Sequence, residues 1–231
     1  MDKRLLCIAN KISDGKGFVD VGTDHGYLPI HMLDHGYTGN IIASDINEEP
    51  LCCAKRNAEK ASYEDKIRFI LCDGLADTVS DDVDTIVIAG MGGDTICGIL
   101  DRAEWCMHSR YRLILQPMSK AEILRFWLSY NDFEIVEECF LDDNGTLYQI
   151  ISAVYGTRCP LSDAELFVGR YVLSSQLPLF GKILRDTKLK FERLIRGLGN
   201  SEKPEDIIRC NFSKKILDEV YNLERAYGDT T

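Results

Sequence analysis

A glycine-rich loop near the amino end carries residues whose types and spacing suggest ligand chemistry. Residues 18–29 read FVDVGTDHGYLP, an apolar run that ends in Asp20 and Gly22, followed by Gly26 and a proline at a helix start. A strand, a tight turn and a helix in this order open a nucleotide-binding α/β unit. Asp24 stands where a dinucleotide fingerprint has its middle glycine. An acid there argues against a pyrophosphate and for a ligand with a cationic group, such as S-adenosylmethionine.

Three further apolar runs end in residues that could complete a cofactor site. The second run ends in Asp45 and Ile46, where a carboxylate can accept both ribose hydroxyls of an adenosine group. The third ends in Asp73 and Gly74, where the acid could accept a hydrogen bond from an adenine amino group. Ligands of open α/β sheets bind at the carboxyl ends of the strands, so we expect one cofactor site there. The fourth run ends in a glycine-rich loop that contributes Gly90, Met91 and Gly92.

The order of predicted elements indicates the fold. Five strands alternate with helices over residues 18–130, and the fifth is expected to end at Pro117. Their apolar runs do not alternate, which is typical of a parallel sheet covered by helices on both faces. Runs at 133–141 and 146–154 flank an Asn-Gly turn and predict an antiparallel hairpin. We therefore expect an α/β class I methyltransferase fold, a Rossmann-like sheet with an antiparallel terminal hairpin.

The rest of the chain reads as helix only. Ser162 is a predicted N-cap, with Glu165 at the capping-box position. Two longer apolar-periodic segments follow, and a Gly- and Pro-containing break at 197–204 separates them. We expect an S-adenosylmethionine-binding methyltransferase domain at 1–157 and a helical, coiled-coil-like domain at 158–231.

The charge distribution is uneven. A net charge of −10 argues against a general nucleic-acid binder. Residues 182–196, however, hold six basic residues against two acids. This segment is either a solvated helix face or a helix that contacts phosphates, as local basic patches of acidic proteins can do. Its basic residues are Lys182, Arg185, Lys188, Lys190, Arg193 and Arg196.

Cysteine and histidine usage favours a metal-free protein of a reducing compartment. The nine cysteines include no Cys-x-x-Cys pair, and the four histidines form no recognisable metal-ligand set with them. No apolar run is long enough to span a membrane, and the amino end reads as a short amphipathic helix through Ile12 rather than a secretory signal. We expect a cytoplasmic protein, without metal or membrane, and we favour a monomer.

Three motifs together resemble one known family. They are DVGTDHGYLP at 20–29, IAGMGG at 88–93 and LILQP at 113–117. In combination they look like the TrmK family of bacterial tRNA (adenine-N1) methyltransferases. The resemblance implies a class I methyltransferase domain followed by a helical coiled-coil domain, and methylation of adenine 22 in the tRNA D-loop. The family usually has Asn after Gln-Pro, whereas this chain has Met118.

The chemistry that this reaction needs suggests roles for four residues. Adenine N1 already has a lone pair near neutral pH, so its methylation needs no strong base but creates a cationic ring that a carboxylate would stabilise. Asp24 could do so, or could equally bind the amino group of the cofactor's methionine part. We expect His25 and Tyr27 to line the pocket mouth, where aromatic rings can receive a flipped base. Gln116 is expected to read the adenine edge.

Two other classes of function stay open at this point. An NAD-linked oxidoreductase would use the same Asp45, but it needs a hydride-transfer partner and a substrate domain that the sequence does not show. A non-catalytic protein could keep the cofactor fold and use its helices as a docking surface.

Overall fold

The computed structural model describes residues 2–78, 81–156, 160–170 and 177–228. Two compact units divide the chain, Met1–Cys159 and Pro160–Thr231. The elements of the first unit are α1 (Lys3–Ala9), β1 (Gly17–Val21), α2 (Tyr27–Asp34), β2 (Asn40–Asp45), α3 (Glu48–Lys60), β3 (Ile67–Leu71), β4 (Thr85–Gly92), α4 (Gly93–Asp101), the 3₁₀ turn η1 (Glu104–Cys106), β5 (Arg112–Ser119), α5 (Ala121–Tyr130), β6 (Phe133–Asp143) and β7 (Thr146–Tyr155). Those of the second are α6 (Asp163–Val168), α7 (Leu177–Leu198) and α8 (Pro204–Gly228).

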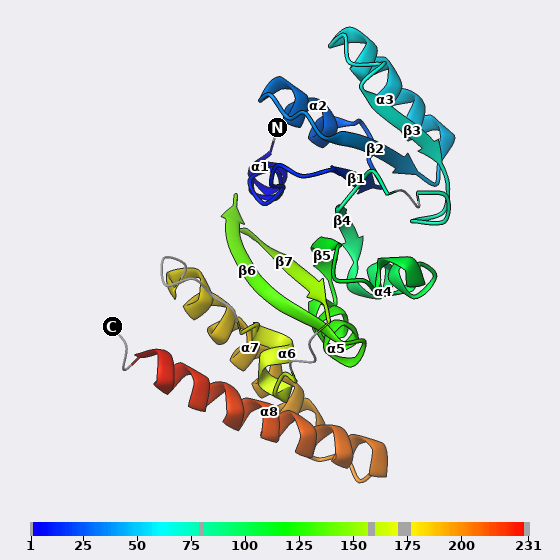
Figure 1. The fold of residues 1–231 in the computed structure, drawn as a ribbon. Helices are drawn as coiled ribbons and strands as arrows, with labels where there is room; N and C mark the ends of the chain where they lie inside the picture. Colours follow the sequence, from blue (N-terminus) through cyan, green and yellow to red (C-terminus); the bar gives the residue numbers. More distant parts are fainter. Residues whose placement is uncertain (1, 79–80, 157–159, 171–176, 229–231) are drawn as a thin grey trace. The chain divides into compact units, whose positions relative to one another are not determined.

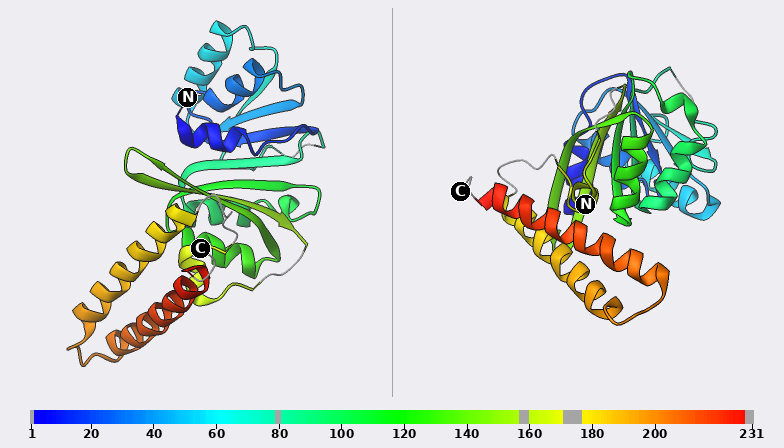
Figure 2. Two further views of the ribbon diagram at one scale, coloured as in Figure 1. Left: turned by 90° about the vertical axis from the view of Figure 1, so that its left-hand side faces the viewer. Right: turned by 90° about the horizontal axis from the view of Figure 1, so that it is seen from below.

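A mixed sheet forms the first unit, with strand order β3-β2-β1-β4-β5-β7-β6. The first five strands in this order pair in parallel, and β7 runs antiparallel to both β5 and β6. Helices lie on both faces of the sheet (Figures 1 and 2). Asn144 and Gly145, with φ of 52° and 85°, form the turn between β6 and β7, because a two-residue hairpin turn of this type needs positive φ at both positions. The predicted class I methyltransferase fold is confirmed.

The fifth strand is longer than its sequence suggests. We expected Pro117 to end it, but β5 continues to Ser119. Pro117 pairs with Met91, where the register between β4 and β5 shifts on both sides. A proline cannot donate a ladder hydrogen bond, and bulges are where a strand accommodates one. The irregularity in β4 therefore explains why β5 continues past Pro117.

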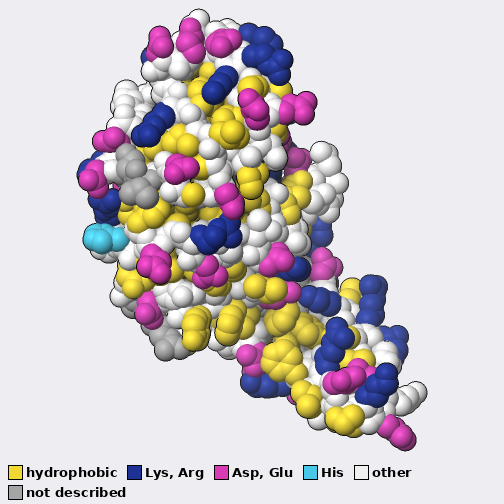
Figure 3. Space-filling view, turned by 90° about the vertical axis from the view of Figure 1, so that its right-hand side faces the viewer, with side chains coloured by type: hydrophobic (Ala, Val, Ile, Leu, Met, Phe, Trp, Pro, Cys, Tyr) yellow, Lys and Arg dark blue, Asp and Glu magenta, His cyan; other side chains and the backbone are white. Residues whose placement is uncertain are grey.

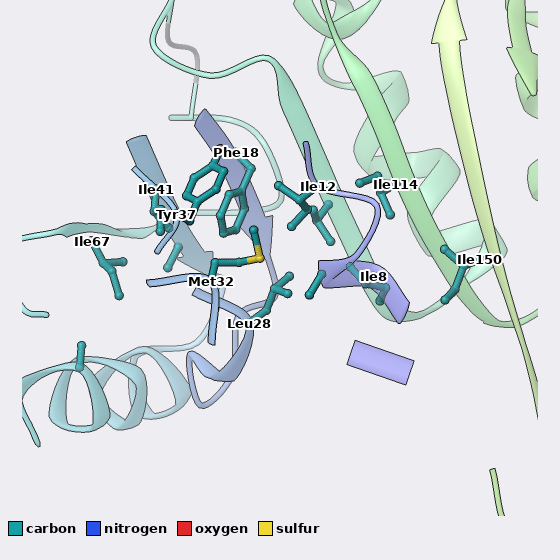
Figure 4. Close-up of a cluster of buried hydrophobic side chains, with 14 of the residues drawn as sticks. Ile8, Ile12, Phe18, Leu28, Met32, Tyr37, Ile41, Ile67, Ile114 and Ile150 are labelled. Carbon is teal, nitrogen blue, oxygen red and sulfur yellow. The ribbon is translucent and has the colours of Figure 1, made fainter. Parts of the chain in front are cut away.

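A buried cluster joins α1 and α2 to the sheet. It contains Ile8 of α1, Phe18 of β1, and Leu28 and Met32 of α2, and continues into β5 through Ile114 (Figure 4). The five residues of β1 are all buried, as expected for a central strand. The predicted first helix exists but ends at Ala9 rather than Ile12. This packing anchors α1 beside the strands that carry the site.

The described residues of the second unit form three helices. Ser162 caps α6, and both hydrogen bonds of the predicted capping box with Glu165 are present. Within the unit, α7 and α8 lie side by side (Figure 2), and each buries apolar residues, among them Phe191 of α7 and Ile216 and Val220 of α8. Among the described residues, no helix is long and apolar enough to cross a membrane.

Candidate active site

A cavity of about 360 Å³ opens at the carboxyl ends of β1, β2, β3 and β4. Seven of the ten predicted cofactor residues line it, together with Asp24, because the parallel register of the strands brings their ends together. The predicted residues that line the cavity are Gly22, Asp24, Asp45, Ile46, Asp73, Gly74, Gly90 and Met91.

The loop after β1 forms one wall of the cavity through its unusual backbone. Gly22 and Asp24 both have positive φ, of 72° and 51°. The N–H groups of Gly22 and Thr23 donate to the carbonyl of Ser44 at 2.8 and 2.9 Å, which ties the loop to β2. A Cβ at Gly22 would lie 2.4 Å from the Met91 methyl, so a side chain there would displace the end of Met91, and the positive φ itself favours glycine.

Asp45 holds the loop from the end of β2. Its carboxylate accepts the N–H of Asp24 at 3.2 Å and that of Asn47 at 2.9 Å, and only 7% of the residue is exposed. An ionised carboxylate offers about four acceptor positions. Asp45 therefore has acceptor capacity for ribose hydroxyls while it fixes the backbone on either side of the cavity.

Asp20 lies beneath the loop rather than in the cavity wall. Its carboxylate is buried and accepts the Thr23 hydroxyl at 2.8 Å. Burial raises the pKa of Asp20 to about 6, although the Thr23 hydrogen bond and the positive charge of Arg4 act against this rise. The charge of Asp45 adds slightly to it. Asp20 thus supports the loop and supplies negative charge behind it.

Three of the predicted catalytic residues form one contacting group, which reaches the cavity through Asp24. Asp24 lines it, and its carboxylate lies 3.6 Å from the imidazole Nε2 of His25. The His25 ring stacks on Tyr27, with centroids 5.3 Å apart and planes at 28°. All three side chains are substantially exposed. A carboxylate beside two exposed rings suits an aromatic group that becomes cationic.

Gln116 occupies a different position from the one we expected. It is fully buried, and its amide oxygen accepts hydrogen bonds from Arg4 at 2.9 Å and from the Gly90 N–H at 3.1 Å. Its amide nitrogen donates to the Pro117 carbonyl and to the Met118 sulfur. These contacts use the whole amide group. Its reading of an adenine edge stays a prediction, and this geometry argues against it.

Two predicted cofactor glycines have local structural roles instead. Gly26 is the N-cap of α2 with φ of 69°, and a Cβ there would lie 3.1 Å from that of Ala54. Gly92 is the N-cap of α4, and a Cβ would lie 2.7 Å from the Asp94 carboxylate. Neither lines the cavity. They let helices start close to the site, and their contact with a cofactor stays a prediction.

Arg102 was missed by sequence reasoning although it stands at the cavity. Its guanidinium pairs with Asp73 at 3.0 Å, and both side chains are 58% exposed. It follows the end of α4, so only the predicted helix boundary could have pointed to it. Asp73 therefore shares its carboxylate between Arg102 and any adenine amino group. Other lining residues without a sequence signal are Ser44, Asn47, Thr95 and Ile99.

The basic segment of α7 divides into two groups of side chains. Lys188 pairs with Glu224 at 2.6 Å and lies over the Tyr221 ring. Lys190 lies over the Phe167 ring, 5.1 Å from its centroid. Both contacts lie within the helical unit, so these two lysines are committed to its internal packing.

The arginines of α7 are placed differently. Arg185, Arg193 and Arg196 are exposed, and the structure gives none of them an ion pair with a described residue. Their spacing places them on one side of the helix together with Lys182, because residues three, four, seven or eight positions apart share a face. Lys and Arg side chains gather on the helical unit in the face shown in Figure 3.

The thiols and imidazoles do not assemble into a metal site in the part of the chain that the structure describes. No group of three or more His, Cys, Asp or Glu residues there could hold a metal ion. All eight described cysteines are free thiols. A metal-free reaction stays a prediction.

The chain resembles known methyltransferases in sequence. The family model described as a methyltransferase domain matches residues 1–151. The tRNA (adenine(22)-N(1))-methyltransferase of Bacillus subtilis is 30% identical over 230 residues, which cover 95% of this chain and 96% of that protein.

Two solved structures resemble the whole chain. A Streptococcus pneumoniae protein in complex with S-adenosyl-L-methionine has 33% identity and a TM-score of 0.78, over 94% of this chain and 99% of that one. Mycoplasma capricolum TrmK in complex with S-adenosyl-homocysteine has 25% identity and a TM-score of 0.77, over 95% and 99%. The likeness therefore includes both units.

Proposed function

This chain belongs to the tRNA (adenine(22)-N(1))-methyltransferase family, and from that membership we propose that it methylates N1 of adenine 22 in the tRNA D-loop. S-adenosylmethionine is the methyl donor. The observation that carries the proposal is the cavity at the strand ends, where Asp24, Asp45 and Asp73 line one space. The NAD-linked and non-catalytic alternatives are not favoured.

The lining residues fit the chemistry of S-adenosylmethionine. When bound, it supplies a methyl group on a cationic sulfonium. Asp45 would accept the ribose hydroxyls, and Asp73, already paired with Arg102, would lie near the adenine. The backbone of the Gly22 and Gly90 loops would approach the rest of the molecule closely.

Asp24, His25 and Tyr27 would act on the target base. We propose that His25 and Tyr27 receive the flipped adenine by stacking, since their rings already stack on each other and are exposed. Asp24 would stabilise the positive charge that develops on the ring as N1 is methylated. The same carboxylate lines the cofactor cavity, so its binding of the methionine ammonium group is the alternative.

The two units would have different functions, cofactor binding and tRNA binding. We propose that the first unit, close to the predicted range 1–157, binds the cofactor, and that the helical unit holds tRNA through Arg185, Arg193 and Arg196. Lys188 and Lys190 are weaker candidates because they are engaged within the unit. We also propose that the protein acts as a monomer in the cytoplasm, where tRNA is used.

Methyl transfer from labelled S-adenosylmethionine to a tRNA transcript tests the proposal. We expect one labelled methyl group per tRNA and thermal stabilisation by S-adenosylhomocysteine but not by NAD. Stabilisation by NAD alone would support the oxidoreductase. Binding of tRNA and cofactor with no transfer under any condition would support a non-catalytic binder.

A further inference from the structure

The Gly90 loop, one wall of the cavity, leaves the regular strand pattern. Ala89 pairs with Gln116 and Met91 pairs with Pro117, so Gly90 is the extra residue of a bulge in β4. Gly90 has φ of 79°, a conformation that favours glycine. A bulged residue needs a substitute partner for its backbone groups. The side-chain oxygen of Gln116 supplies it by accepting the Gly90 N–H at 3.1 Å.

Gln116 in turn depends on Arg4 for its orientation. One guanidinium nitrogen of Arg4 donates to the same amide oxygen at 2.9 Å. That nitrogen would lie only 3.2 Å from a Cβ built on Gly90, so the guanidinium sits directly against the bulge. An amide flip of Gln116 would place its NH₂ group against two donors, which Arg4 makes unfavourable. Arg4 therefore selects the amide orientation that holds the loop.

The first helix fixes Arg4 in this position. Asp2 caps α1 by accepting the Leu5 N–H at 2.7 Å, and its carboxylate also lies 3.5 Å from the Arg4 guanidinium. Ile8, one turn further on, is buried in the cluster that joins α1 to the sheet (Figure 4). The Arg4 side chain is only 20% exposed. It is thus held against the Gly90 bulge and lies mostly out of solvent.

We propose that Arg4 is a positioning residue for methyl transfer, which acts through Gln116 to hold the Gly90 loop in its cofactor-binding shape. This proposal rests on the function proposed above. It gives α1, which precedes the first motif of the site, an indirect part in the reaction. The positive charge of Arg4 makes a second contribution, because it opposes the burial-induced rise in the pKa of Asp20.

Substitutions at Arg4 distinguish the effect of its hydrogen bond to Gln116 from the effect of its packing. Arg4→Met keeps the apolar stem but removes the donor and the charge, whereas Arg4→Lys keeps a cationic donor. The matched control is Lys3→Met on the same helix, where the side chain is 67% exposed and pairs with Asp143 at 3.4 Å. Each variant is measured as the full chain, for S-adenosylhomocysteine affinity by calorimetry and for transfer to tRNA.

We expect Arg4→Met to raise the Kd for S-adenosylhomocysteine by roughly tenfold, the scale of one lost charge-assisted hydrogen bond. Its KM for tRNA should stay within about twofold. Arg4→Lys should restore most of the affinity, and Lys3→Met should bind as the wild type does. Amide hydrogen exchange at Gly90 should accelerate in Arg4→Met, a change that loss of a remote surface contact would not produce.

A double-mutant cycle decides whether Arg4 acts through Gln116. The double variant Arg4→Met/Gln116→Ala should bind S-adenosylhomocysteine no more weakly than Gln116→Ala alone, since coupled residues are not additive. Fully additive losses, or equal losses in Arg4→Met and Lys3→Met, would overturn the inference. The measurements of S-adenosylhomocysteine affinity need no tRNA. A wild-type protein that fails to methylate tRNA would therefore contradict the proposed function, while the test of Arg4 could still be carried out.

Discussion

The backbone N–H of Asp24 donates to the carboxylate of Asp45 at 3.2 Å. In the function proposed above, this bond connects the loop that would face the reacting base with the strand end that would face the cofactor ribose. Asp24 has a positive φ of 51°, a conformation that costs a non-glycine residue free energy, and the Asp45 carboxylate helps to hold it there. The proposed function therefore predicts that the side chain that accepts the cofactor's ribose also holds the loop that faces the reacting base.

Asp45→Ala should weaken S-adenosylmethionine binding by about 1.5–3 kcal/mol, the range for hydrogen bonds to a charged acceptor. Asp45→Asn should lose less, because an amide oxygen can still accept the Asp24 N–H. Exposed Asp65, which precedes β3 at the opposite edge of the sheet, provides the control substitution Asp65→Ala. An unchanged calorimetric affinity in Asp45→Ala would remove Asp45 from the site.

Cofactor affinity should fall as the pH drops through 6. Burial raises the pKa of Asp20 to about 6, so its negative charge behind the loop disappears below that pH. At pH 5 only about one tenth of the groups stay ionised. Calorimetry with S-adenosylhomocysteine from pH 7.5 to 5 should show this loss in the wild type and a flatter profile in Asp20→Asn. Parallel profiles would assign the pH dependence to another group.

The same carboxyl should affect folding stability with the opposite sign. Its pKa in the folded protein is raised above the ordinary value of 3.8, so the folded state holds the proton to higher pH than the unfolded chain does. Its contribution to stability is therefore present in full below pH 3.8 and is lost as the pH rises through about 6. Asp20→Asn should thus stabilise the cofactor-free protein at pH 7.5 more than at pH 5, as measured by thermal unfolding. A stability difference that does not depend on pH would contradict this assignment.

Asp24→Asn should lower kcat on tRNA while it leaves cofactor affinity nearly intact. The amide keeps the size of the side chain but removes the charge that would stabilise the methylated ring. Single-turnover kinetics and calorimetry on the same preparation separate the two effects. Lost cofactor binding with normal residual turnover would instead assign Asp24 to the methionine ammonium group.

Replacing Arg185, Arg193 and Arg196 by Ala should weaken tRNA binding and flatten its salt dependence. Each lost phosphate contact is expected to reduce the slope by roughly one unit. Lys188→Ala is the matched control on the same helix, because its ammonium group already pairs with Glu224 and should change the slope little. If the triple variant keeps the wild-type slope, the arginines form only a solvated helix face.

Much of the fold could be predicted because local patterns agree with the tertiary structure. The apolar run of β1, the Asn144–Gly145 turn and the Ser162 capping box each have a short-range physical cause. The prediction that Pro117 ends its strand was wrong, because a bulge in the neighbouring strand allows β5 to continue past the proline. A sequence pattern does not reveal which irregularities lie opposite one another.

The site was predicted only where a residue stands at a strand end. Asp45 and Asp73 follow from that rule, because strand register brings them to one edge. Gln116 also belongs to a strand motif, yet its side chain is buried and accepts a hydrogen bond from the Gly90 N–H instead of lining the cavity. Arg4 lies on α1 and Arg102 follows the end of α4, and the sequence does not specify how these helices rotate and pack. Their roles depend on long-range contacts.

Mapping the methylated nucleotide tests the central claim most directly. The full-length protein is incubated with S-adenosylmethionine and either a tRNA transcript that contains adenine 22 or the same transcript with guanine there. Mass spectrometry of nuclease fragments then locates the methyl group. The account predicts one N1-methyladenine per tRNA, at position 22, and an unmethylated guanine-22 transcript. Methylation at another nucleotide, or equal methylation of both transcripts, would contradict it.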